Sequence, residues 1–221
     1  NISRTLRAMA RYLTELIGTF FLVFVIGMTA VAGLSAAPIA IGCTLMVMVY
    51  MGGHISGAHY NPAVSIAVFL RGSLEKSDLL PYIAAQLLGA WLAASAVLAV
   101  TGATFAPAPG AGYGTLAVVL SEVLLTFALV LVILNVATSP ATEGNSYYGL
   151  AIGFTVLAGA YAVGPISGGA FNPAVGFGPI LVDTLAGEGS FENLWHYIVW
   201  PIAGGLLAVP VFRMQHSAES D

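Results

Sequence analysis

Two asparagines interrupt apolar stretches of the chain, and each is followed by proline and alanine. The triplets are Asn61-Pro62-Ala63 and Asn172-Pro173-Ala174. Asparagine is a favoured N-cap residue and proline suits the first helical turn, so each triplet predicts the start of a short helix. Helix N-termini carry positive partial charge, and each carboxamide adds N–H donors. This arrangement predicts hydrogen bonding to neutral polar molecules rather than covalent chemistry.

Each asparagine is preceded at a short distance by a segment that contains glycine and alanine. The two segments are Gly57-Ala58-His59 and Gly168-Gly169-Ala170. At membrane depth, non-helical backbone is tolerated only where it is buried or lines a water-filled cavity. We therefore predict a pore with a central pair of Asn donors and a ladder of carbonyl acceptors. The acceptors expected are the carbonyls of Gly57, Ala58, His59, Gly168 and Ala170.

The composition predicts the solvent in which these elements fold. The chain has 221 residues, of which 58% are hydrophobic and 7% are charged, and its mean hydropathy is +0.93. Soluble domains carry about 25% charged residues, so we predict a polytopic membrane protein. No basic patch indicates a nucleic-acid partner. No metal-ligand cluster or nucleophile–base pair stands out, so we expect neither an enzyme nor a cofactor or metal.

Six stretches are long enough to span a bilayer, which takes about 20 apolar residues. They cover about 9–33, 38–57, 79–101, 115–137, 148–166 and 194–213. The first follows three arginines and could be mistaken for a signal peptide, but its apolar core is too long, so we interpret it as a mature helix. Two shorter segments, Pro62–Leu70 and Pro173–Val182, are expected to be re-entrant half-helices.

The chain contains an internal repeat. Residues 55–64 read ISGAHYNPAV and residues 166–175 read ISGGAFNPAV, while 82–89 (YIAAQLLG) pair more loosely with 197–204 (YIVWPIAG). Repeat 1 (about 9–101) and repeat 2 (about 115–213) each hold three spans and one half-helix. Three is an odd number, so the repeats must be inverted. The predicted fold is a single all-α membrane channel domain over 1–221, with 101–114 as an exposed connector.

The basic residues predict the orientation. All six Lys and Arg residues fall on one side of the predicted topology. By the positive-inside rule that side is cytoplasmic, together with the N- and C-termini. We expect an integral protein of the cell (inner) membrane.

With both Asn-Pro-Ala triplets and the paired Glu15 and Glu122, the sequence resembles the aquaporin (major intrinsic protein) family over essentially its whole length. The resemblance implies a passive channel for water and small neutral solutes, assembled as a homotetramer in membrane lipid with one pore per subunit. It also implies a selectivity filter at Ile41, Ala160, Gly169 and Val175.

The filter departs from that of orthodox water channels, which have an arginine where this chain has Val175. The run Asn172–Pro179 (NPAVGFGP) resembles members of the plant vacuolar-membrane branch, and some arsenite-passing bacterial members also lack the arginine. We expect a wide apolar filter that passes solutes of the glycerol, urea, ammonia, hydrogen peroxide or arsenite class.

Three further titratable residues have two interpretations each. Carboxylates inside apolar helices are usually functional, so Glu15 and Glu122 could couple protons in a transporter. The family resemblance instead implies a scaffold role, in which they bind the backbone of the re-entrant loops. His54 could be a pore ligand or a structural histidine, and we expect the structural role. The alternative functions are a water-selective aquaporin, a secondary active transporter and a junctional protein.

Overall fold

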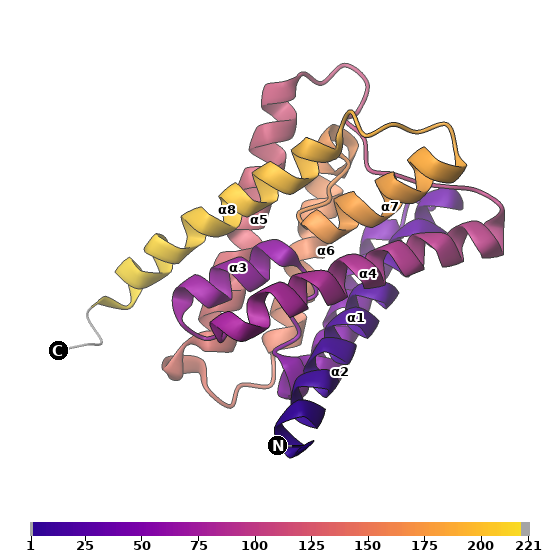
Figure 1. Ribbon diagram of the computed structural model, residues 1–221. Coiled ribbons are helices and arrows are strands. Elements are labelled where there is room, and N and C mark those ends of the chain that lie inside the picture. The colour runs from indigo at the N-terminus through magenta and orange to yellow at the C-terminus, as the bar shows by residue number, and fades with distance from the viewer. Residues whose placement is uncertain (1, 218–221) are drawn as a thin grey trace.

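The computed structural model describes residues 2–217, which form long helices around two short ones and contain no strand (Figure 1). The long helices are α1 (Ile2–Val31), α2 (Ala37–Ser56), α4 (Lys76–Thr101), α5 (Thr115–Thr138), α6 (Tyr148–Ser167) and α8 (Leu194–Gln215). The short ones are α3 (Pro62–Arg71) and α7 (Pro173–Ala186), with a 3₁₀ turn at Pro140–Thr142. All six long helices are long and apolar enough to cross a membrane, which confirms the predicted fold class.

The two halves of the chain make equivalent contacts. Helix α1 packs against α2 and α4, as α5 packs against α6 and α8. Helices α2 and α6 join the halves, and each short helix reaches across to the other half, α3 to α8 and α7 to α4. Figure 1 shows α3 and α7 between α8 and α4. Chain direction puts the start of α1 and the end of α8 on one face, here called the terminal face. The opposite face, which carries residues 102–114, is the connector face.

Left-handed glycines end the helices that lead into the two interruptions. Gly57 follows α2 with φ 88° and Gly168 follows α6 with φ 90°. Glycine lacks the Cβ that makes this conformation unfavourable for other residues, and it is the usual way to end a helix. The chain thereby turns back toward the middle of the bundle before α3 and α7 begin.

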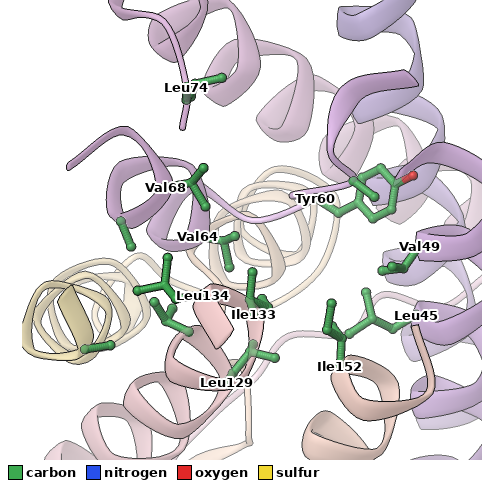
Figure 2. Close-up of a cluster of buried hydrophobic side chains, with 14 of the residues drawn as sticks. Leu45, Val49, Tyr60, Val64, Val68, Leu74, Leu129, Ile133, Leu134 and Ile152 are labelled. Atoms are coloured by element: carbon green, nitrogen blue, oxygen red, sulfur yellow. The ribbon is translucent and has the colours of Figure 1, made fainter. Parts of the chain in front are cut away.

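Apolar side chains from both halves pack around the first half-helix. Figure 2 shows Val64 and Val68 of α3 near Ile133 and Leu134 of α5, with Tyr60 at the start of the same segment. These side chains are all buried. The helix is too short to span a bilayer and is held in place by this packing.

Glycines set the closest helix contacts. A Cβ on Gly89 of α4 would clash with the carbonyl oxygen of Leu16 in α1. In the second half, a Cβ on Gly204 of α8 would clash with the carbonyl oxygen of Val123 in α5. Small residues allow such close approach, which stabilises helix pairs in lipid by van der Waals packing.

The connector between the halves differs from the exposed segment predicted. Residues 103–107 are half-buried, and the N–H of Gly110 donates to the carbonyl of Ile166 at 2.9 Å. The Phe105 ring packs against the apolar cluster that includes Val175. Glycine and proline mark a loop correctly, but the segment carries no charged residue and folds back onto the bundle.

We predict that Gly89→Val lowers the thermal unfolding midpoint, because the added side chain forces α1 and α4 apart. The expected loss is about 1–3 kcal/mol, as for overpacked cores. The measurement is thermal denaturation of the purified protein in detergent. Gly114→Ala is the matched control, since a Cβ there meets nothing within 4 Å. Equal midpoints for wild type and Gly89→Val would contradict the close α1–α4 contact.

Candidate pore

The side chains of Asn61 and Asn172 cap the two short helices. Each Oδ1 accepts a hydrogen bond of 2.9 Å, from the N–H of Ala63 and of Ala174 respectively. Both asparagines have extended backbone, with φ of −157° and −158°. This is N-cap geometry, and it leaves the amide nitrogens free to point away from the helices.

The side-chain amide nitrogen of each asparagine donates a hydrogen bond to a backbone carbonyl of the other half of the chain. The Nδ2 of Asn61 donates to the carbonyl of Phe171, and the Nδ2 of Asn172 donates to the carbonyl of Tyr60, both at 2.9 Å. An amide nitrogen carries two hydrogens, so each asparagine retains one for a solute. The structure thus brings two donors together that are far apart in sequence.

The loop before Asn61 contains strained backbone held by a buried carboxylate. Ala58 and Tyr60 have positive φ values of 52° and 51°. The Oε1 of Glu15 accepts from His59 N–H at 3.0 Å and from Ser56 Oγ at 2.7 Å, and its Oε2 accepts from Tyr60 N–H at 2.7 Å. Strained conformations persist where surrounding contacts over-determine them, as they do here.

Glu122 makes the equivalent contacts in the second half. Its Oε1 accepts from Ser167 Oγ at 2.7 Å and from Ala170 N–H at 3.1 Å, and its Oε2 accepts from Phe171 N–H at 2.7 Å. Together these partners occupy both oxygens of the Glu122 carboxylate. Because the loop N–H groups point toward Glu122, the loop carbonyls are left to face other partners.

A cavity of about 410 Å³ adjoins both asparagines. Its lining includes the four predicted filter residues Ile41, Ala160, Gly169 and Val175, together with Ala58, His59, Gly168 and Ala170. One cavity therefore contains both asparagines, the four filter residues and four of the five residues whose carbonyls were predicted to line the pore. The fifth, Gly57, is not in its lining. No group of three or more His, Cys, Asp or Glu side chains within the described residues is placed to hold a metal ion.

The cavity also has walls that sequence reasoning missed. They come from α1, with Leu22, Ile26 and Ala30, and from the connector, with Phe105, Ala106, Pro107 and Ala108. The signal that could have revealed the connector is its lack of charge together with the apolar run around Phe105. The α1 residues carry no signal beyond apolarity.

A second cavity opens on the terminal face and takes up two residues of the predicted site. Gly57 and His54 line it together with Ser73, Ser139, Glu143 and Asn145. His54 is exposed, and no hydrogen bond joins it to any residue from 2 to 217. Its position at the last turn of α2 places His54 at this open mouth rather than in the core, and its structural role stays a prediction.

Comparison with known proteins identifies the family. The family model for major intrinsic proteins matches residues 2–212. The chain belongs to the major intrinsic protein family. As a member, it is an integral membrane protein that forms a passive channel for water and small solutes.

Relatives come from plants, archaea and bacteria. The chain is 38% identical to aquaporin NIP1-1 of Oryza sativa, over 89% of this chain and 70% of the relative. It is 35% identical to the probable aquaporin AqpM of Archaeoglobus fulgidus (95% and 98% covered) and 35% identical to the glycerol uptake facilitator protein-like 6 of Lactiplantibacillus plantarum (96% and 100%). The X-ray structure of the aquaglyceroporin from Plasmodium falciparum matches with a TM-score of 0.82 at 25% identity, over 93% of this chain and 95% of that one.

We predict that Glu122→Gln destabilises the second loop. A glutamine nitrogen in place of either oxygen removes the acceptor of Ala170 or Phe171 N–H. Leaving a buried donor unpaired costs about 1–3 kcal/mol, so the unfolding midpoint and the water permeability should both fall. Glu192→Gln, at an exposed position, is the control. Unchanged stability and permeability in Glu122→Gln would show that the loop does not depend on the carboxylate.

Proposed function

We propose that the chain is a channel of broad selectivity for small neutral solutes, with a wide apolar filter at Ile41, Ala160, Gly169 and Val175. The solutes are of the glycerol, urea, ammonia, hydrogen peroxide or arsenite class. The observation that carries the proposal is the lining of the 410 Å³ cavity, in which none of the described residues is Lys, Arg, Asp or Glu.

The physical argument starts from Val175. Its side chain is buried and lines the cavity one helical turn after Asn172. A valine offers no hydrogen-bond donor and no charge, and it occupies less length than an arginine. A solute in this part of the pore then meets apolar walls and backbone carbonyls, and the space for a larger solute remains open. The relatives named as aquaglyceroporin and glycerol uptake facilitator support a solute larger than water.

The centre of the pore provides the barrier to ions. The N-termini of α3 and α7 meet there, and each asparagine retains an N–H donor. The positive ends of two helices disfavour cations and hydrated protons, whereas a neutral molecule can exchange its water contacts for these groups. Glu15 and Glu122 serve as scaffold, since their oxygens accept hydrogen bonds from the N–H groups of the two loops.

We place the protein in the cell (inner) membrane as a homotetramer, with one pore in each single-domain subunit made of repeats 9–101 and 115–213. All six Lys and Arg residues lie near helix ends on the terminal face. This distribution supports a cytoplasmic terminal face. Family membership supports the tetramer.

We predict that Val175→Arg lowers glycerol and urea permeability much more than water permeability, by about tenfold or more for glycerol. The new side chain fills part of the filter, while single-file water can still hydrogen-bond to its guanidinium. The measurement is stopped-flow light scattering on matched proteoliposomes.

The matched control is Val175→Leu, which adds bulk without a donor or a charge. It should reduce glycerol flux less than the arginine does. A wild type that conducts water but excludes both glycerol and urea would contradict the broad filter.

A further inference from the structure

A series of side-chain hydrogen bonds connects His59, in the first re-entrant loop, to Glu15. The Nδ1 of His59 lies 3.0 Å from Ser65 Oγ, and Ser65 Oγ accepts from Gln86 Nε2 at 2.9 Å. Gln86 Nε2 also donates to Glu15 Oε2 at 2.8 Å. All four side chains are buried, and three of them are completely inaccessible to solvent.

This chain of hydrogen bonds breaks the symmetry of the two repeats. In the alignment of the repeats, His59 corresponds to Ala170, Ser65 to Gly176 and Gln86 to Pro201. The second half therefore keeps the glutamate and its loop but has no side chain that could continue the network. The second loop is thus held without counterparts of His59, Ser65 and Gln86.

The orientation of the Gln86 amide is determined by its neighbours. Its Nε2 donates both hydrogens, one to Glu15 and one to Ser65, while its buried Oε1 has no partner among the described residues. Reversing the amide would put that oxygen against the Glu15 carboxylate. An acceptor facing an acceptor is repulsive, so the amide keeps this orientation although Oε1 stays unpaired.

The hydroxyl of Ser65 transmits this orientation to His59. Ser65 is completely buried, so its hydroxyl hydrogen needs an acceptor inside the protein. His59 Nδ1 is the one acceptor within hydrogen-bond distance among residues 2–217, since Gln86 Nε2 is a donor. The opposite tautomer, with hydrogen on Nδ1, would leave the buried Ser65 hydrogen without an acceptor. Nδ1 is therefore the acceptor, and the ring hydrogen sits on Nε2.

The protonated nitrogen faces the pore. His59 lines the 410 Å³ cavity, and its Nε2 lies beside Gly57, which lines the cavity of the terminal face. Nε2 makes no hydrogen bond to any described residue, and it is not one of the fully buried polar atoms that lack a partner. The ring thus stands where the two cavities approach one another, with one unused N–H.

We propose that His59 is a specificity-determining residue that presents a fixed Nε2–H donor to passing solutes, and that Ser65 and Gln86 are positioning residues for this tautomer. The inference rests on the proposed channel for neutral solutes and adds the requirement for an acceptor. Side-chain donors then occur at the centre and on the terminal-face side, whereas the filter on the connector-face side has none. A solute with a carbonyl or hydroxyl oxygen is favoured at this position.

The tautomer can be tested without any transport assay. Protein labelled with ¹⁵N-histidine in lipid bilayers should give, for His59, a protonated Nε2 and an unprotonated Nδ1, with the signal assigned by its loss in His59→Phe. Ser65→Ala removes the donor to Nδ1 and should yield a mixture of tautomers. Ser121→Ala, at a buried serine whose hydroxyl donates to the Ala117 carbonyl of its own helix, should leave the signal unchanged. A wild-type Nδ1–H signal would overturn the proposal.

The donor role is tested by solute flux in proteoliposomes. His59→Phe retains a ring without a donor, so urea permeability should fall about three- to tenfold relative to water permeability, the effect of one hydrogen bond. His59→Gln offers an N–H again and should recover part of the urea flux. Equal losses of urea and water flux in His59→Phe, without recovery in His59→Gln, would mean a packing role and overturn the inference.

The two proposals fail in different ways. A wild type that excludes urea and glycerol contradicts the broad filter, and the tautomer signal then decides the geometry of His59 by itself. A wild type that conducts urea, with a permeability unaffected by His59→Phe, contradicts the donor role and leaves the broad filter intact.

Discussion

Backbone N–H groups at membrane depth need acceptors inside the protein, because lipid offers none. The structure meets this requirement with two buried carboxylates, Glu15 and Glu122, each of which takes two consecutive loop N–H groups and a serine hydroxyl. Without these acceptors the chain could not leave helical geometry between α2 and α3 or between α6 and α7. The pore depends on those two departures.

The carboxylates also decide what the pore wall offers. Since they occupy the N–H groups of both loops, the opposite carbonyls are available, and those of Tyr60 and Phe171 hold the asparagines. The same glutamate that stabilises the first loop orients Gln86, and through Ser65 it reaches the His59 ring. Structural support and the hydrogen-bonding character of the wall are therefore one network in the first repeat and separate features in the second.

Local rules made much of the fold predictable. Asn-Pro at a helix start, apolar runs of about 20 residues and an odd number of spans per repeat were sufficient to predict the half-helices and their inversion. These features depend on residues close in sequence or on an internal repeat. The four filter residues, which line one cavity, were instead implied by the family resemblance.

Long-range partners were less accessible to sequence reasoning. Gln86 lies 71 residues from Glu15, and nothing in its own helix distinguishes it from a polar residue on a lipid-facing turn. The placement of His54 depends on how the loop after α5 leaves an open mouth, which no local pattern encodes. The connector was expected to be exposed because it is rich in glycine and proline. These residues indicate backbone conformation and do not indicate burial.

That connector has a consequence for how the two repeats can be related. The linker between the repeats also forms part of the cavity wall. Its residues Phe105, Ala106 and Pro107 line the cavity at the connector face. Two half-chains that both lacked residues 105–107 would leave a gap at this mouth even if all eight helices found their places. The covalent joining of the repeats therefore supplies a piece of the conduit itself, and the fused chain is more than two halves held together.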